Sequence, residues 1–194
     1  DQDGNIWVGF RSEGVDFINR LTGDIRHFDA DSETTALKNN SVRAIYPDRR
    51  NTLWVGYYSG FARIKKSNES QIHFNQAKDQ YGKVIQIQGT PYVFFEDKRD
   101  DFWIGTSLGL FKYDRENGTC EWKLFKGADI LPNVGNFIRS IAEDDKGNMW
   151  LATDGNGVYQ YHPGTGAFKM YQHFLGDSAT LAHNKVYCIV AIVR

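Results

Sequence analysis

The sequence predicts an all-β protein made of small tandem sheets, the architecture of a β-propeller, and three observations support this. Tryptophans recur at positions 7, 54, 103 and 150, at intervals of 47, 49 and 47 residues. An aspartate precedes each tryptophan by six positions, and a glycine or alanine follows it by two. The segments between are short, aromatic and β-branched, as strands are. A fixed period of about 40–50 residues with such strands indicates propeller blades.

Each repeat divides into four short segments bounded by Gly, Asn, Asp and Ser, which favours four-stranded antiparallel blades. The expected units are 1–29, which lacks its leading strand, then 42–75, 91–125 and 137–172, with 185–194 starting a further blade. We expect this single segment to be part of a larger ring, for example a seven-bladed one. The expected strands are 6–10, 15–18, 25–28, 42–46, 53–57, 61–64, 71–74, 92–96, 102–106, 110–113, 120–125, 137–142, 149–153, 158–161, 168–171 and 186–190.

The repeated motif has a structural explanation. In the last copy, the Asp144 carboxylate can accept backbone N–H bonds in the turn, and Gly147 or Asn148 can take the left-handed conformation that the turn needs. Trp150 is expected to be buried between neighbouring blades, and Ala152 to let the next sheet approach. The residues assigned to this structural repeat are Asp1, Trp7, Asp48, Trp54, Asp97, Trp103, Asp144 and Trp150.

The order of these motifs resembles the two-component regulator propeller repeat: Val-Arg-x-Ile-x-x-Asp, then Gly-Asn-x-Trp-x-Gly-Thr, then Gly-x-x-x-Tyr. The spacers 31–40 and 177–184, each ahead of a valine, strengthen the likeness, which covers essentially the whole chain. The third repeat departs from the pattern, with Pro91 at the valine position and a spacer (77–90) that lacks the Ser-x-Leu-x-x-Asn signature. Ile192 stands where the period demands an aspartate.

The resemblance implies a non-enzymatic sensor segment. Such repeats form periplasmic sensor regions of hybrid two-component regulators in Bacteroides-type bacteria, which commonly detect glycan breakdown products and switch on polysaccharide-utilisation genes. Histidine kinase activity and the phosphorelay would lie elsewhere in the full-length protein. The implied partners are an oligosaccharide or other small-molecule ligand, the remaining blades of the same chain, and a second copy of the full-length receptor.

The candidate ligand residues lie at the end of the blades opposite the repeated turn. Eleven residues before the tryptophans stand Arg43, Tyr92 and Arg139, and Tyr187 takes the same place in the last strand. Guanidinium groups pair with carboxylate or sulfate and aromatic rings stack on sugars, so a sugar acid or sulfated sugar would suit them. The alternative is that these side chains cover apolar strand edges. The loop residues added to this set are Tyr57, Tyr58, Asp154 and Asn156.

Other functions are disfavoured by composition. The formal net charge is -1 and there is no long basic run, so nucleic-acid binding is not expected. The longest apolar run, 186–193, is too short to span a bilayer. Cys120 and Cys188 differ in their place in the repeat and are expected to be buried and unbridged. The five histidines lack metal-ligand spacing, and no cofactor motif is present.

Two other classes stay open. The first is a propeller glycoside hydrolase or lyase of the sialidase kind, because Asp145, Gly147 and Trp150 match half of an Asp-box turn. That turn is itself structural, and no acid–base pair of carboxylates can be assigned from the sequence. The second is a protein-binding scaffold of the WD-repeat kind, although the Gly-His and Trp-Asp dipeptides are missing. Fold alone does not decide among these classes.

Overall fold

The computed structural model describes residues 1–31, 37–58, 60–65, 76–78, 84–86, 89–123 and 137–192. These residues form strands and no helix, so none of them provides a helix that could cross a membrane. The chain divides into two compact units, 1–94 and 95–194, and the boundary falls inside one strand. The predicted all-β class and its blade-like sheets are confirmed.

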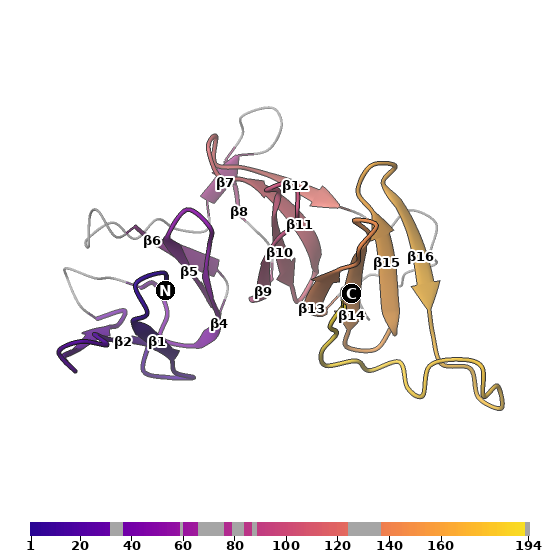
Figure 1. The fold of residues 1–194 in the computed structure, drawn as a ribbon, viewed down its shortest axis with the longest axis horizontal. Helices are drawn as coiled ribbons and strands as arrows, with labels where there is room; N and C mark the ends of the chain where they lie inside the picture. Colours follow the sequence, from indigo (N-terminus) through magenta and orange to yellow (C-terminus); the bar gives the residue numbers. More distant parts are fainter. Residues whose placement is uncertain are drawn as a thin grey trace. The chain divides into compact units, whose positions relative to one another are not determined.

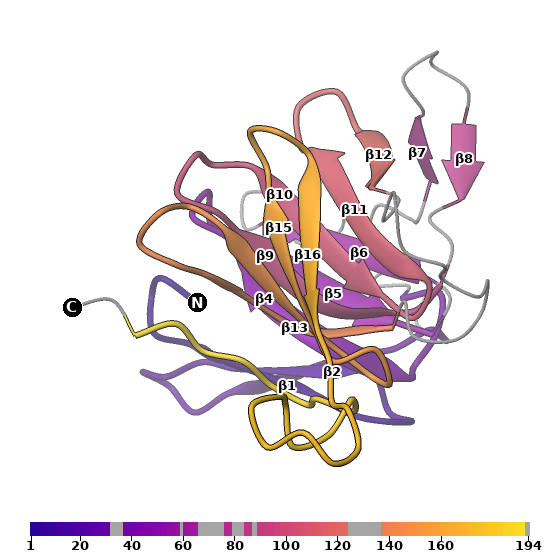
Figure 2. The ribbon, with the colours of Figure 1, turned by 90° about the vertical axis from the view of Figure 1, so that its right-hand side faces the viewer.

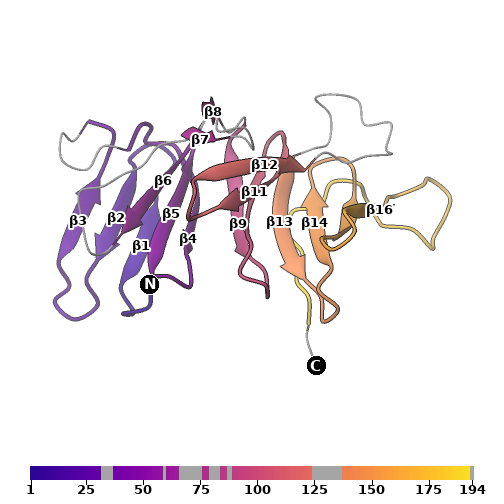
Figure 3. The same cartoon turned by 90° about the horizontal axis from the view of Figure 1, so that it is seen from above.

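The first unit contains two blade-like sheets and a short hairpin (Figure 1). Each sheet is an antiparallel meander, ordered β1-β2-β3 and β4-β5-β6. The innermost strands β1 and β4 lie beside each other, as Figure 3 shows. The strands are β1 (Ile6–Gly9), β2 (Val15–Ile18), β3 (Ile25–Phe28), β4 (Val42–Pro47), β5 (Thr52–Tyr57) and β6 (Gly60–Lys65), and the hairpin is β7 (Gln76–Lys78) with β8 (Val84–Gln86).

The third and fourth blades follow the same antiparallel order, β9-β10-β11-β12 and β13-β14-β15-β16. The boundary between the units lies inside β9. Every strand of these two blades, and of β1–β6, begins and ends within two residues of an expected strand. The strands are β9 (Pro91–Glu96), β10 (Phe102–Thr106), β11 (Gly109–Asp114), β12 (Thr119–Lys123), β13 (Ile138–Glu143), β14 (Met149–Thr153), β15 (Val158–His162) and β16 (Ala167–Tyr171).

One expected strand is not reproduced and another is not tested. The segment 71–74 lies outside the described residues. The stretch 186–190 is in no strand, and only Lys185 before it makes an isolated bridge to Asp154. A strand is defined by its ladder, and this stretch has none among the described residues. Pro91, by contrast, does open β9, a position where its missing N–H removes little ladder bonding.

The repeated aspartate closes the turn just before the strand that carries the tryptophan, and in the second to fourth blades this turn joins the first two strands. Its Oδ1 accepts backbone N–H bonds from the residues two and four positions later, as Asp144 does from Lys146 (3.0 Å) and Asn148 (2.8 Å). Its Oδ2 accepts the indole N–H of the tryptophan six positions later. Those distances are 3.1 Å for Trp7–Asp1, 2.8 Å for Trp54–Asp48, 3.1 Å for Trp103–Asp97 and 2.9 Å for Trp150–Asp144. We call this arrangement the Asp–Trp clip.

The clip explains two further positions of the repeat. The third residue after each aspartate has a positive φ, which only Gly, Asn and Asp adopt at low cost. These residues are Gly4 (78°), Asn51 (57°), Asp100 (65°) and Gly147 (78°). Of the two positions proposed for the left-handed residue, Gly147 is therefore the one that takes it. The expected role of the Asp144 carboxylate, accepting backbone N–H bonds in the turn, is confirmed. Its hydrogen bond from the Trp150 indole is a further contact that the sequence does not predict.

Two of the four tryptophans, Trp54 and Trp103, are buried as expected, whereas Trp7 is only half-buried and contacts Phe17 and Phe28 of its own blade. Trp54 and Trp103 are each 1% exposed. Within the first unit Trp54 faces Phe94 of the next blade at 6.0 Å, and within the second Trp103 faces Tyr161 at 5.6 Å. Trp150 is only half-buried, and it stacks on Tyr171 of its own blade at 5.3 Å.

Small residues two positions after the tryptophans let sheets approach. A Cβ added at Gly9 would lie 2.6 Å from Val42 Cγ1, and one at Gly56 would lie 3.0 Å from the Pro91 Cβ. The first distance is shorter than real side-chain contacts and the second is tighter than most of them, so a larger residue at Gly9 would push β1 away from β4, and one at Gly56 would press on Pro91 of β9. The close approach predicted at these positions is confirmed for both glycines.

The cysteines behave differently from each other. Both are free, as expected. Cys120 on β12 is buried, and burial raises the pKa of its thiol to about 12, with a smaller contribution from Glu121. Cys188 is exposed, so the expectation that it is a buried residue is wrong. The reason is that no described strand covers the stretch after Val186.

Candidate functional site

The spacer before the second blade ends in a structural asparagine. The Asn40 carbonyl accepts the N–H of Gly14 (3.0 Å), and its side-chain Oδ1 accepts the N–H of Ala30 (2.7 Å). The N–H of Val42 then donates to the Phe10 carbonyl at 2.9 Å, which brings β4 alongside β1. The asparagine thus ties the end of one blade to the start of the next. We call it the spacer clip.

The same clip recurs after the fourth blade. The Asn184 carbonyl accepts the N–H of Gly157 (2.7 Å), and its Oδ1 accepts the N–H of His173 (2.6 Å). The N–H of Val186 donates to the Thr153 carbonyl at 2.8 Å, as Val42 does to its own partner. The stretch after β16 therefore returns to the inner edge of the blade, which Figures 1 and 2 show.

This return brings four side chains of the second unit together. Three of them are predicted ligand residues, and the fourth is a lysine. Arg139 lies on β13, Asp154 directly follows β14, and Lys185 and Tyr187 follow the spacer clip. The Arg139 guanidinium pairs with one oxygen of Asp154, and Lys185 Nζ lies 3.2 Å from the other. We define these residues, Arg139, Asp154, Lys185 and Tyr187, as the blade-four cluster.

Two aromatic rings lie close to the Arg139 guanidinium. The Arg139 Cζ lies 4.4 Å from the centroid of Phe137 and 5.2 Å from that of Tyr187. The Lys185 ammonium lies 5.8 Å from the same Tyr187 ring. Cations within about 6 Å of a ring face are attracted by its quadrupole. Tyr187 is nevertheless 64% exposed, so one face of the cluster remains open to solvent.

The charges of the cluster set its protonation. Partial burial acts to raise the pKa of Asp154, but hydrogen bonds and positive charges from Arg139 and Lys185 outweigh burial and hold this pKa below its ordinary value. The hydrogen bond to Asp154, together with its negative charge, raises the pKa of Lys185. All three groups are therefore charged at neutral pH, with two cations sharing one carboxylate.

Asn156 contributes to the loop rather than to the cluster. Its backbone N–H donates to the Thr153 Oγ1 at 3.0 Å. Burial raises the pKa of Tyr159, and a hydrogen bond with the Asn156 side chain acts in the opposite direction. Its geometry thus places Asn156 beside a buried tyrosine of β15.

The other predicted ligand residues belong to the first unit. Tyr57 is 3% exposed and its hydroxyl donates to the Phe61 carbonyl at 3.2 Å, so its side chain lies in the blade core and not at a ligand surface. Its neighbour Tyr58 is 60% exposed. Arg43 on β4 and Tyr92 on β9 are half-buried. The convergence of these residues with Arg139 and Tyr187 on one mouth stays a prediction.

The sequence did not single out Lys185 and Phe137 as site residues. A signal for Lys185 was present, because it follows the spacer asparagine and precedes the valine that starts the next unit. The position Asn-x-Val recurs at 40–42, but with Ser41 in place of the lysine. The lysine is therefore a feature by which the two copies differ.

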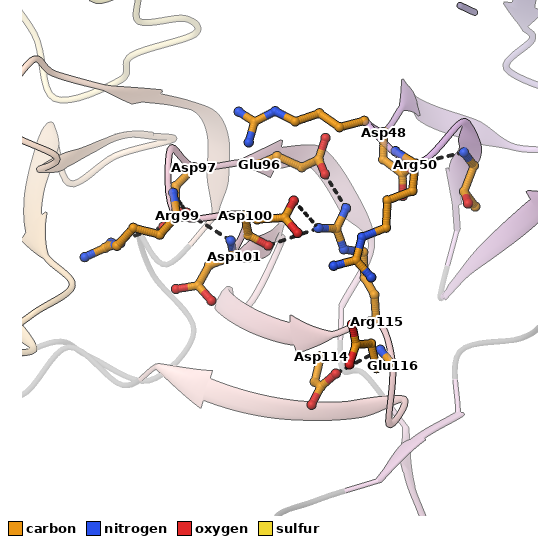
Figure 4. Close-up of polar contacts among 12 residues, drawn as sticks. Asp48, Arg50, Glu96, Asp97, Arg99, Asp100, Asp101, Asp114, Arg115 and Glu116 are labelled. Atoms are coloured by element: carbon orange, nitrogen blue, oxygen red, sulfur yellow. Dashed lines mark hydrogen bonds and ion pairs between the residues drawn. The ribbon is translucent and has the colours of Figure 1, made fainter.

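A second charged group, in the third blade, is structural (Figure 4). The Arg115 side chain, 6% exposed, pairs with the fully buried Glu96 carboxylate and with Asp100 Oδ1 at 2.6 Å. Its Cζ also lies 5.3 Å from the Phe102 ring centroid. These contacts fix the turn between β9 and β10 from the end of β11. Among the described residues no group of three or more His, Cys, Asp or Glu is arranged to hold a metal.

Comparison with known proteins agrees with the repeat pattern. The family model for the two-component regulator propeller matches residues 36–59 and 134–155, which contain one spacer, two inner strands and two Asp–Trp clips. Two segments of the chain therefore match the two-component regulator propeller repeat. Both matched segments also include candidate ligand residues, Arg43 in the first and Arg139 in the second.

The proteins similar to this chain include a histidine kinase and extracellular domains of putative one-component and two-component systems. Histidine kinase P4 of Formosa agariphila is 34% identical over 77 residues, which are 37% of this chain and 5% of the kinase. The extracellular domain of the putative one-component system BT4673 from B. thetaiotaomicron matches with a TM-score of 0.78 at 24% identity, over 97% of this chain and 23% of that domain. The corresponding domain of the putative hybrid two-component system BT3049 matches with a TM-score of 0.71 at 19% identity, over 94% and 22%. The chain thus spans a small part of each relative.

Proposed function

We propose that the chain is part of the ligand-sensing propeller of a hybrid two-component sensor, situated in the periplasm. Its ligand is a glycan-derived oligosaccharide, and binding regulates polysaccharide-utilisation genes through a kinase elsewhere in the full-length protein. The propeller repeats support the sensor class. The full-length receptor would act as a dimer, and the remaining blades of the chain would complete the propeller.

The observation that carries the ligand proposal is the blade-four cluster. Saccharide sites combine an exposed aromatic face with charged and polar groups that fix the orientation of the sugar. Tyr187 provides a ring that is 64% exposed, and Arg139, Asp154 and Lys185 surround it with hydrogen-bonding groups. These residues lie where the repeats differ, whereas the Asp–Trp clips are shared by every blade.

The proposal assigns no catalysis to this segment. The aspartates of the repeat, which resemble an acid-rich active site in the sequence, are engaged in turn geometry. Asp48 and Asp97 are 2% and 0% exposed, and their oxygens accept backbone and indole N–H groups. Carboxylates held in this way are poorly placed to reach a glycosidic bond.

A binding screen tests the proposal. Isothermal titration of the full chain against oligosaccharide fragments should find at least one ligand, and Tyr187→Ala should weaken its binding by about tenfold, the loss of one stacking contact. Phe174→Ala is the matched control, because Phe174 is 58% exposed in the same unit but lies outside the cluster. Equal weakening by both variants, or no binding by any fragment, would overturn the proposed site.

A further inference from the structure

We propose that the blade-four cluster binds an anionic group of its ligand, a carboxylate or a sulfate, and that Asp154 is an internal anion which the ligand displaces. This inference rests on the proposed function for the sugar part of the ligand. The anionic part rests on the charge and geometry of Arg139 and Lys185 alone.

The charge balance of the cluster favours an incoming anion. One carboxylate, Asp154, pairs with both the Arg139 guanidinium and the Lys185 ammonium. The side chains are 27% exposed for Arg139, 45% for Lys185 and 17% for Asp154, so the cations are more open than the anion between them. Within this trio positive charge exceeds negative by one. A second anion can therefore approach the cations from solvent.

The geometry favours a group with two oxygens. Arg139 contacts the rings of Phe137 and Tyr187 and pairs with Asp154, so its planar fork is oriented before any ligand arrives. A pre-oriented guanidinium pairs with carboxylate or sulfate through two parallel hydrogen bonds. Tyr187 stands beside this fork with most of its surface in solvent, where a sugar ring attached to the anion can stack.

Displacement of Asp154 requires only side-chain movement. The backbone around it is fixed by the spacer clip: the N–H groups of Gly155 and Gly157 donate to the Asn184 carbonyl at 3.2 and 2.7 Å, and the Asp154 N–H donates to the Phe137 carbonyl at 3.1 Å. The loop therefore keeps its shape while the carboxylate rotates away. No bond is made or broken in this exchange, which is a competition between two anions for the same cations.

The test compares an oligosaccharide that ends in a uronic acid with the same oligosaccharide after reduction of its carboxyl group. Titrations use the full chain. The acid should bind about tenfold more tightly, because a charge-assisted bidentate pair is lost in the reduced form. Arg139→Gln and Lys185→Gln should remove most of that preference. Equal affinity for the two forms would overturn the inference while leaving the proposed function intact.

Asp154→Asn distinguishes a competitor from a positioning residue. If Asp154 competes with the ligand, Asp154→Asn should bind the acid several-fold more tightly than the unmodified chain. Asp145→Asn, which changes the net charge equally at an exposed position of the same unit, controls for general electrostatics. Weaker binding of the acid by Asp154→Asn, or the same gain in Asp145→Asn, would sink the competitor role.

Inorganic sulfate tests the anion site without a sugar. Sulfate should shift the amide NMR signals of residues 154 and 185–187 in a saturable way, and Arg139→Gln should abolish the shift. A saturable shift with no oligosaccharide binding would retain the anion site and reject the glycan ligand. No shift would reject the anion site, whatever the saccharide screen shows.

Discussion

Two aspartates in the second unit, Asp97 and Asp154, show how the same residue serves different purposes. The Asp97 side chain is completely buried, and it accepts hydrogen bonds from groups within six residues of it in the chain. The Asp154 side chain is 17% exposed and pairs with cations that lie 15 and 31 positions away, Arg139 and Lys185. The turn and indole hydrogen bonds of the Asp97 kind recur in every blade. The ion pairs of Asp154, in contrast, join three separate segments of the chain.

The difference indicates which contacts belong to folding and which are open to ligands. A buried carboxylate with all its donors nearby forms whenever its turn forms, and it cannot exchange partners without unfolding that turn. A partly exposed carboxylate that pairs with two partly exposed cations can give those cations up to another anion.

Loss of a clip tryptophan should have the largest effect. Trp103→Ala removes a ring that is 1% exposed and packs against Tyr161, so we expect a loss of about 3–5 kcal/mol in the free energy of unfolding, measured by urea denaturation. Trp122→Ala is the matched control, because Trp122 is outside the repeat and 41% exposed. A similar loss in both variants would contradict the assignment of the clip as the source of blade stability.

The paired substitutions Asp97→Asn and Asp154→Asn test the comparison directly. In Asp97→Asn an amide N–H₂ must face either the Trp103 indole N–H or a backbone N–H, so a buried donor loses its acceptor. We expect a loss of about 1–3 kcal/mol in urea denaturation. Asp154→Asn should cost clearly less, because its partners are partly hydrated. If Asp154→Asn is the more damaging variant, the second aspartate is a folding element as well.

Acid should weaken the clip of the fourth blade. Burial acts to raise the pKa of Asp144, but the Trp150 indole and the N–H groups of residues 146 and 148 more than offset burial and lower this pKa below its ordinary 3.8. A lowered carboxyl pKa contributes stability that is present above 3.8 and lost as pH falls through the folded-state value.

Comparison with a non-titrating variant measures this contribution. The stability difference between the unmodified chain and Asp144→Asn should therefore be constant from pH 5 to 7 and should shrink below about 3.8, in urea titrations at each pH. A difference that grows as the pH falls would show that the carboxylate is not the favoured form in the folded chain.

The smallest expected effect concerns His27 in the first blade. A hydrogen bond to Asp16 at 2.5 Å raises its pKa above 6.5, and the charges of Asp16, Asp29 and Glu13 add to this. A raised histidine pKa contributes stability that is complete below 6.5 and lost as pH rises through the folded-state value. His27→Gln should then lower the melting temperature slightly at pH 5.5 and not at pH 9.

The partner variant controls for other effects of the substitution. Asp16→Asn should produce the same small decrease at pH 5.5, and the double variant should be little worse than either single one because both remove the same pair. Additive decreases would mean that the two residues act separately.

The strand pattern and the clip were predictable because they are local. An aspartate, a left-handed residue and a tryptophan within seven positions specify a turn, and short runs of aromatic and β-branched residues bounded by Gly, Asn, Asp and Ser specify the flanking strands. What the spacing did not reveal was the indole N–H bond to Oδ2. Its cue was the constant separation of six residues, which a packing role for the tryptophan does not by itself require.

Side-chain exposure was harder to predict. Tyr57 and Tyr58 are adjacent and chemically identical, and both were candidate ligand residues. All six residues of β5 are buried, so both faces of this strand are covered, and Tyr57, its last residue, is buried with them. Tyr58 lies just beyond the strand and is exposed. Which of the two is buried therefore depends on where the covered strand ends.

By itself, the sequence determined the class of fold, the period of the repeat and the scaffold role of its aspartates, since these depend on residues close together in the chain. Only the tertiary structure decided that Lys185 meets Asp154 and that Tyr187 meets Arg139. These contacts follow from the return of the chain after β16, where Asn184 ties it to the loop between β14 and β15 and to His173. Contacts between distant segments depend on where the chain is anchored, and a one-dimensional pattern does not contain that information.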